Sequence, residues 1–401
     1  MRFAKQFYQS LTLKPQGFTM IIAAFLPVFA IIAMFPVVGA IITHFKDDPD
    51  AAIKVPAMVT APGYAIALLA PFVGAVVDRF GRRRMLLACT FFYGIVGTAP
   101  FFMENLDSII ASRILLGVCE AGILTTVNTL IADYWDDGKR RNWLMLQGLI
   151  GPAFQPAVFV MVAAVAAVRW NGGFLVYLAA LPIFAAMYVW LFEPAKPDAR
   201  DFVVNDSNMN ATGPAFPWGT AAIVGGMTLS ASVLYYVFIV NGSMVWQELG
   251  LSDPMAISTA TLIPSLFILP GSMLFKFASR YSSAVQIAMF LTLLGAGLAG
   301  MGAAHTVLQA QIALTLQQMG AGMAVPALIA WSQTRFAFAH RGRGMGVWTS
   351  AFFLGQAISP IIVGHVAQGV GTMQHAFVTT GAVGVGLALV VLIIGGRRAA
   401  A

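Results

Sequence analysis

The sequence predicts an all-α polytopic membrane protein with twelve transmembrane helices. Hydrophobic residues occupy 59% of the 401 positions and charged residues only 10%, with a mean hydropathy of +0.81. A soluble globule of this size could not hide so much apolar surface. Twelve apolar runs are long enough to cross a bilayer, and the basic residues gather between them. Composition therefore excludes a soluble enzyme, a disordered chain and a disulfide scaffold, since Cys89 and Cys119 are the only cysteines.

Each apolar run is predicted to be a helix, because a backbone surrounded by lipid must satisfy its own hydrogen bonds. A helix needs about 20 residues to cross the hydrocarbon core. The expected spans are residues 17–44, 55–77, 85–103, 108–132, 143–168, 173–192, 218–245, 254–275, 284–304, 307–334, 345–368 and 374–395.

The basic residues predict the orientation of the chain. If the N-terminus lies inside, 19 of the 23 Lys and Arg residues lie on the inner side, and only Lys46, Lys54 and Arg169 lie outside. This asymmetry is the positive-inside pattern. Both termini are therefore expected in the cytoplasm, and the membrane is expected to be a bacterial cytoplasmic one. The net charge of +7 reflects this topology and predicts no nucleic-acid partner, because no soluble basic domain is present.

The longest polar stretch, residues 194–217, divides the apolar runs into two sets of six. It contains Pro, Asn and Asp and has no apolar helical stripe. Such a composition is typical of a linker. We expect an N-terminal bundle at 1–193, a cytoplasmic linker at 194–217 and a C-terminal bundle at 218–401.

The loop after the second run reads Gly74-Ala-Val-Val-Asp78-Arg79-Phe80-Gly81-Arg82-Arg83-Arg84. Gly81 permits a tight turn, and Asp78 is suited to the N-terminus of another helix. The loop resembles the signature G-x-x-x-D-R-x-G-R-R-[KR] of the major facilitator superfamily, in residues, spacing and position. The resemblance implies two pseudo-symmetric six-helix bundles that transport a small molecule by alternating access.

The same resemblance implies a cytoplasmic gate. The family's aspartate, here Asp78, meets the start of the eleventh span, near residues 344–347. Arg82 is expected to pair with an acid at the inner end of the fourth span, Asp133. The expected gate residues are Gly74, Asp78, Arg79, Gly81, Arg82, Arg83 and Asp133. A degenerate copy of the loop follows the eighth span, where Gly271 and Lys276 repeat its first glycine and arginine positions.

Two ionisable residues lie inside the fourth span. Arg113 and Glu120 are seven positions apart and therefore share one helix face. Ionisable groups within a span are costly and face a cavity or a partner. Two interpretations stay open: Glu120 carries a proton under the influence of Arg113, or the two residues form a structural pair.

The fifth span carries Gly148, Gly151 and Pro152 in a pattern that resembles the G-x-x-x-G-P-x-x-G-G motif of drug–proton antiporters in the superfamily. Gly151 and Pro152 match, Gly148 stands one residue late, and Gln155 and Pro156 replace the glycine pair. The resemblance implies export. The alternative is ordinary helix packing, for which small residues and prolines also serve.

Polar and aromatic residues within the spans are the candidates for a substrate cavity. The small number of charged residues within the spans indicates a neutral, lipophilic or weakly charged substrate. The candidates are Asn128, Gln147, Gln155, Tyr235, Tyr236, Asn241, Gln317, Gln318 and Gln356.

No cofactor or metal is expected. The five histidines lack metal-ligand spacing, and no lysine precedes Ser or Thr, so a nucleotide-binding loop is absent. The predicted function is secondary transport, with proton-coupled efflux of a drug or metabolite favoured over an uptake symporter or facilitator. A membrane enzyme or receptor is disfavoured, because no catalytic constellation is present. The expected partners are a small molecule, protons and the bilayer, with one chain sufficient.

Overall fold

The computed structural model describes residues 12–135, 139, 143, 146, 154, 157–158, 160–166, 169–194, 216–278, 280–336 and 338–400. Within these residues every regular element is helical, and the all-helical membrane fold is confirmed. The expected fifth span, 143–168, lies largely outside the described residues.

The first half of the chain contains helices interrupted by short 3₁₀ turns. Its elements are α2 Lys14–Met34, η1 Phe35–Val37, α3 Val38–His44, α4 Ala51–Thr60, α5 Pro62–Phe80, α6 Arg82–Thr98, η2 Ala99–Phe102, α7 Leu106–Tyr134, η3 Gly172–Ala179 and α9 Ala180–Trp190. The second half contains longer helices. Its elements are α10 Trp218–Glu248, α11 Pro254–Ser265, α12 Ile268–Ala278, α13 Ser283–Gly302, α14 Val307–Arg335, α15 Phe338–Val370 and α16 Met373–Ala400.

Ten helical runs among the described residues are long and apolar enough to cross a membrane. The pair Ala51–Thr60 and Pro62–Ala70, bent by 41°, would be an eleventh. Every expected span except 143–168 coincides with one of these runs or with the bent pair. The bend falls at Pro62, because proline lacks the amide hydrogen and clashes with the preceding turn.

Polar caps fix where several helices begin. The side chain of Asn105 accepts hydrogen bonds from the amides of Asp107 and Ser108 at the start of α7. Asp253 caps α11 and Thr306 caps α14 in the same way. These residues satisfy the amides that a helix N-terminus leaves unpaired.

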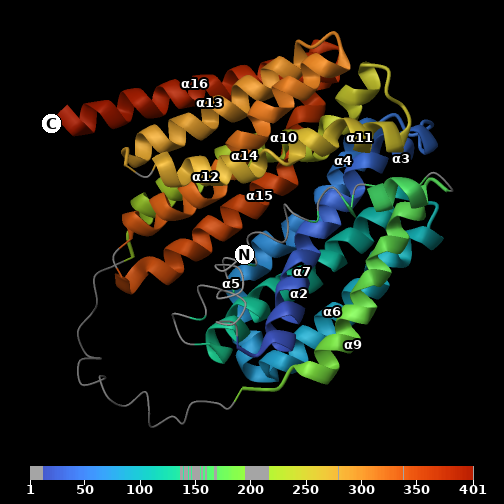
Figure 1. Ribbon diagram of the computed structural model, residues 1–401, viewed down its shortest axis with the longest axis vertical. Helices are drawn as coiled ribbons and strands as arrows, with labels where there is room; N and C mark the ends of the chain where they lie inside the picture. Colours follow the sequence, from blue (N-terminus) through green and yellow to red (C-terminus); the bar gives the residue numbers. More distant parts are fainter. Residues whose placement is uncertain are drawn as a thin grey trace, which may run out of the picture.

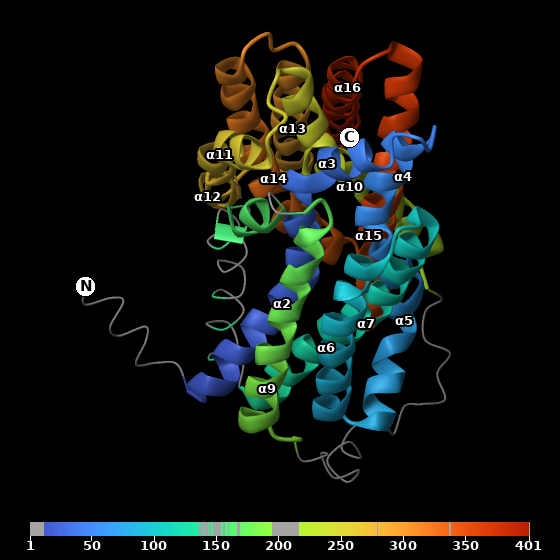
Figure 2. The same ribbon diagram turned by 90° about the vertical axis from the view of Figure 1, so that its right-hand side faces the viewer.

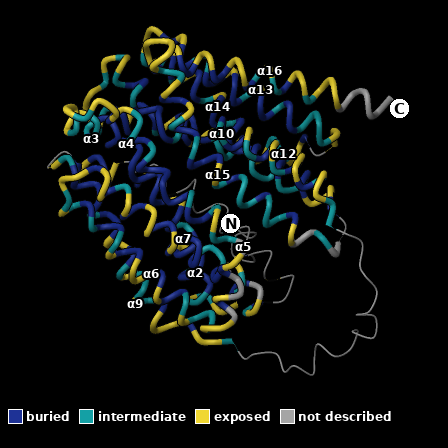
Figure 3. The backbone as a smooth tube through the Cα atoms, turned by 180° about the vertical axis from the view of Figure 1, so that it is seen from behind, coloured by how far each residue is buried: buried dark blue, intermediate teal, exposed yellow. Residues whose placement is uncertain are grey.

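The helices form two groups that meet at one end (Figures 1 and 2). Helices α2 to α9 make one group and α10 to α16 the other, and they approach each other where α3, α4, α10 and α11 lie. They diverge toward the start of α15 and the end of α9. Buried residues follow the faces between helices and exposed ones the outside (Figure 3). The exposed side chains include large apolar ones such as Val189 of α9, 72% exposed, as expected of a surface that faces lipid.

The divergence opens a cleft of about 1040 Å³ between α5 and α15. Tyr64 and Leu68 line one side, and Arg343 and Val347 line the other. At the closed end the two groups touch, since the Thr60 hydroxyl donates to the carbonyl of Ala357 at 3.3 Å. The molecule is therefore open toward the side that carries the basic loops.

Candidate functional site

A cavity of about 290 Å³ lies between the two groups of helices. Its walls come from both groups. They consist of Pro27, Val28, Ile31, Ile32, Phe35, Leu124, Tyr235, Tyr236, Phe238, Ile239, Ile268, Gln318, Ala321, Val325, Phe352, Phe353 and Gln356.

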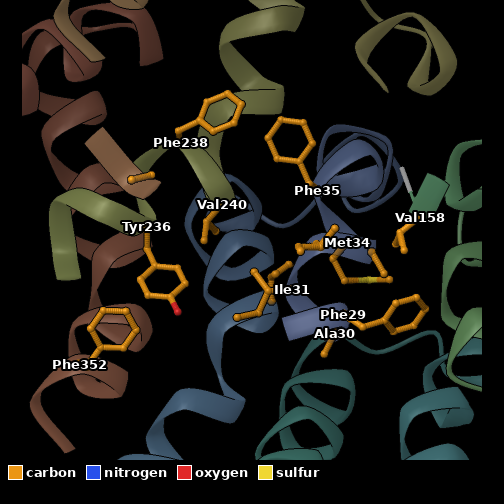
Figure 4. Close-up of a cluster of buried hydrophobic side chains, with 14 of the residues drawn as sticks. Phe29, Ala30, Ile31, Met34, Phe35, Val158, Tyr236, Phe238, Val240 and Phe352 are labelled. Carbon is orange, nitrogen blue, oxygen red and sulfur yellow. The ribbon is translucent and has the colours of Figure 1, made fainter. Parts of the chain in front are cut away.

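Aromatic rings form much of the wall (Figure 4). Phe35 faces Phe238 across the two groups, with ring centroids 5.1 Å apart. Phe352 lies 5.7 Å from Tyr236 and stacks on Trp348 at 5.2 Å. Packed aromatic rings of this kind make a wall of fixed shape that favours flat apolar ligands.

Among the described residues, the polar groups of the cavity come from α10, α14 and α15. They belong to Tyr235, Tyr236, Gln318 and Gln356. The described lining residues of the first group of helices are apolar, such as Ile31 from α2 and Leu124 from α7. No Asp, Glu, Lys, Arg or His stands among the lining residues that the structure describes.

Gln356 is the most unusual of the polar groups. Its side chain is fully buried, and neither its amide nitrogen nor its amide oxygen has a hydrogen-bond partner. By contrast, the amide nitrogen of Gln318 donates to Gln317 at 2.8 Å. Buried polar groups are nearly always hydrogen-bonded, so an amide with two free ends requires an explanation.

Glu120 and Arg113 lie in the interior of α7, and each is only 1% exposed. Arg113 donates to the carbonyls of Val96 and Gly97 at 3.0 and 2.8 Å. Its guanidinium also stacks on Tyr177, 5.0 Å from the ring centroid. Arg113 therefore binds α6 and η3 rather than Glu120.

The Glu120 carboxylate forms no ion pair with a described residue. Its Oε1 atom is buried and has no hydrogen-bond partner. Glu120 is not itself a cavity residue, but Leu124, one helical turn later, lines the cavity.

The loop between α5 and α6 has the turn that the sequence predicts, with Gly81 at φ 92°. Arg82 forms an ion pair with Asp133. Arg83 donates through Nε to the carbonyl of Leu191 at 2.7 Å, and Arg79 is exposed. The Asp78 side chain lies outside what the structure describes, and so does its expected contact with residues 344–347. Of Gly74, only the helical backbone is described.

Sequence reasoning missed one residue of this loop, Glu193. Its carboxylate accepts hydrogen bonds from the backbone amides of Arg82 and Arg83 at 2.6 and 2.9 Å. A carboxylate at this position stabilises the N-terminus of α6. The available signal was that Glu193 is the first acid after the sixth apolar run, opposite a loop of arginines.

The remaining candidates have different locations. Asn128 is exposed and does not line the cavity. Asn241 is buried, and its amide donates to the carbonyl of Val237 at 3.3 Å. Gln317 accepts a hydrogen bond from Gln318 and does not itself line the cavity. The fifth-span residues Gly148, Gly151 and Pro152, together with Gln147 and Gln155, fall outside the described residues.

Two groups of helices long and apolar enough to cross a membrane, with a cavity between them, are typical of membrane transporters. The sequence profile of the Major Facilitator Superfamily matches residues 17–309 and 203–400. The chain belongs to this superfamily, whose members are transporters.

Sequence relatives are distant. The niacin transporter NiaP of Acinetobacter baylyi is 27% identical over 141 residues, which cover 35% of this chain and 31% of that protein. A putative tartrate transporter of Agrobacterium vitis is 23% identical over 327 residues, which cover 74% of each chain. The chain thus spans less than a third of the length of the niacin transporter.

Solved structures share the fold. A bacterial homologue of the human lysosomal transporter Spinster, in an inward-facing and occupied conformation, has a TM-score of 0.76 at 12% identity, covering 95% of this chain and 96% of that one. The human organic anion transporter MFSD10 has a TM-score of 0.67 at 15% identity, covering 95% and 99%.

Proposed function

We propose that the chain is a secondary active transporter that exports a small, uncharged and largely apolar organic molecule in exchange for protons, with Glu120 as the proton-carrying group. A single chain, placed in a bacterial cytoplasmic membrane with both termini in the cytoplasm, suffices for this activity. The proposed transport cycle needs no cofactor.

The buried carboxyl group of Glu120, whose Oε1 atom has no hydrogen-bond partner, carries the proposal. An ionised carboxylate is costly to bury, and inside a membrane such groups mark ion pathways. A carboxyl group that exchanges a proton as the protein rocks between its two states avoids this cost. Leu124, one helical turn from Glu120, lines the cavity, which places the proton site next to the substrate site in this proposal.

The chemistry of the cavity supports an uncharged substrate. Niacin and tartrate, for which two relatives are named, are carboxylates at neutral pH. A buried carboxylate needs a cation or several donors to replace its hydration. The part of this cavity that the structure describes has no cationic side chain in its lining, so we assign the chain a different, neutral substrate.

The direction of transport rests on the fifth-span resemblance at Gly151 and Pro152. The gate rests on the loop that contains the Arg82–Asp133 pair. In this proposal the cleft between α5 and α15 closes on the cytoplasmic side when Asp78 reaches the start of α15, and export requires the opposite opening.

Proton movement in proteoliposomes tests the proposal. The vesicles hold an acidic interior and an internal pH dye, and neutral aromatic compounds are added outside one at a time. A compound exchanged for protons raises the internal pH with the wild-type protein and leaves it unchanged with Glu120→Gln. The exposed acid at the start of the same helix, Asp107, gives the matched control Asp107→Asn, which keeps the wild-type response.

Other outcomes identify other mechanisms. Entry of a compound without proton movement, equally fast in the wild type and in Glu120→Gln, indicates a facilitator and contradicts the proposal. Acidification on substrate entry indicates a symporter, which contradicts export but keeps Glu120 as the carrier if Glu120→Gln abolishes it.

A further inference from the structure

The free amide of Gln356 points to a feature of the substrate. Gln356 is fully buried, lines the central cavity and leaves both ends of its amide unpaired. A buried amide without partners costs free energy that a complementary ligand restores. The observation holds whichever end of the amide carries the nitrogen, since both ends are free.

The backbone around Gln356 is held in place from both groups of helices. The Ser232 hydroxyl of α10 donates to the carbonyl of Phe352 at 2.5 Å, and the Ser359 hydroxyl donates to the carbonyl of Val233 at 2.8 Å. From the other group, Thr60 donates to Ala357. A polar group on a fixed backbone recognises a ligand more selectively than one on a mobile loop.

Gly63 of α5 brings the opposite wall close to this amide. A Cβ atom at this glycine would lie 2.8 Å from the carbonyl of Phe353 and 3.4 Å from the amide nitrogen of Gln356. The absence of a side chain at Gly63 therefore lets α5 approach α15 at the height of Gln356. Gln356 is therefore enclosed between the two groups, at the wall of the cavity.

The side-chain amide presents an NH2 donor group and a carbonyl acceptor side by side. A group that pairs with both at once carries an N–H and a C=O on the same edge, as in a primary carboxamide or a lactam, whereas an open-chain secondary amide is trans and directs them to opposite sides. The walls formed by Phe352, Phe353 and Tyr235 fit an aromatic ring beside that group. A volume of about 290 Å³ limits the ligand to one or two rings.

We propose that Gln356 is a specificity-determining residue that pairs with the primary carboxamide or lactam group of a small aromatic substrate. The inference rests on the proposed function, because it takes the central cavity as the transport site. It goes beyond it by naming the substrate class and the side chain that selects it.

Binding of two simple probes to the purified full chain tests the inference. Benzamide carries the donor and the acceptor, whereas N,N-dimethylbenzamide keeps the acceptor and lacks the donor. We expect the wild-type protein to bind benzamide about tenfold more tightly by calorimetry, as a buried hydrogen bond predicts. In Gln356→Leu the two probes bind within about twofold of each other, because the leucine keeps the volume and removes both hydrogen bonds.

Controls separate this result from misfolding. Gln311→Leu makes the same change on α14 at a residue whose amide donates to Ala260 and does not line the cavity, so it keeps the preference for benzamide. Gln356→Met, closer in shape to glutamine, serves if Gln356→Leu does not fold. Failure of benzamide to bind the wild type, equal binding of both probes, or a preference that survives in the variants overturns the inference.

The test distinguishes this inference from the proposed function. Loss of the preference in Gln356→Leu without any proton movement in the wild type supports the amide site and contradicts proton exchange. Proton exchange with apolar compounds in a wild-type protein that does not prefer benzamide supports the proposed function and contradicts the amide site.

Discussion

The two halves of the molecule bury different polar chemistry. In the described part of the first half, the buried side chains include a charged acid and base, Glu120 and Arg113. In the described part of the second half, the buried polar side chains are neutral, with the amides of Gln317, Gln318 and Gln356 among them. Of these groups, only Gln318 and Gln356 reach the cavity. The buried ionisable side chains and the buried amides thus lie on separate helices, which predicts that the proposed proton exchange and the proposed substrate recognition respond to different substitutions.

Crossed substitutions are expected to produce the largest effect. We expect Glu120→Gln to abolish proton-coupled flux while leaving the affinity for benzamide within about threefold, since Glu120 does not line the cavity. We expect Gln356→Leu to weaken benzamide binding about tenfold while the protons exchanged per substrate stay unchanged. Flux and calorimetry on the same preparations measure both. Loss of both properties in either variant would show that the two sites act as one.

Removal of the Arg113 guanidinium is expected to cost stability rather than coupling. Arg113→Met leaves the carbonyls of Val96 and Gly97 without their donor and removes the contact with Tyr177. We expect the free energy of unfolding in detergent to fall by about 3 kcal/mol. Arg169→Met is the control, because Arg169 likewise lies over an aromatic ring, that of Phe101, but has a side chain that is 51% exposed. We expect this change to lower the free energy of unfolding by less than about 1 kcal/mol.

The opposite pattern for Arg113 would revise the comparison. A stable Arg113→Met protein that transports without moving protons would assign Arg113 to proton exchange. The buried acid and base of α7 would then act together despite the absence of an ion pair.

Glycines that bring helices together test whether the halves pack alike. In the first half, a Cβ atom at Gly117 of α7 would lie 2.3 Å from the carbonyl oxygen of Pro62. In the second half, a Cβ atom at Gly322 of α14 would lie 2.1 Å from the carbonyl oxygen of Ile268. We expect each change to alanine to lower the midpoint of thermal unfolding, at a cost of about 2 kcal/mol. Gly219→Ala, which meets open space, does not lower it. A tolerated change in one half alone would show that the pseudo-symmetry does not extend to these contacts.

The sequence predicts the spans well because the bilayer imposes a length on them. Runs of apolar residues locate α13 and α14 within a few residues, since nothing inside them competes with the helix. It does not predict which faces meet. The span at 108–132 is apolar around most of its circumference, so no stripe distinguishes the cavity face at Leu124 from the exposed position at Asn128.

The candidate site is predicted only in part, for a related reason. Tyr235, Tyr236 and Gln356 line the cavity because polar and aromatic side chains inside a span tend to avoid lipid. The absence of an Arg113–Glu120 pair follows from the carbonyls of α6, which are distant in sequence and bind the guanidinium. Glu193 was missed because a single acid at the end of a span resembles any interfacial residue until α6 is placed beside it.

The loops at the end of the molecule where the two groups of helices meet are held differently in the two halves. Removing one of these contacts is expected to have the smallest effect of the substitutions considered. In the second half, the carboxylate of Glu248 accepts hydrogen bonds from two backbone amides, those of Met373 and Gln374. In the first half, Asp48 pairs with the Lys54 ammonium at 2.8 Å and accepts the amide of Asp50 at 2.9 Å.

The hydrogen bond from Lys54 holds the pKa of Asp48 below its ordinary value of 3.8. A lowered pKa in the folded state means that the pair contributes fully above pH 3.8 and is lost as the pH falls through the lower, folded value. We expect the Asp50 amide to exchange faster with solvent hydrogen at the acid end, after correction for the intrinsic pH dependence of exchange. Asp48→Asn removes that acceleration. The same acceleration in Asp48→Asn would assign the acid sensitivity to another group, and the Asp48–Lys54 pair would then not be the contact that holds this loop.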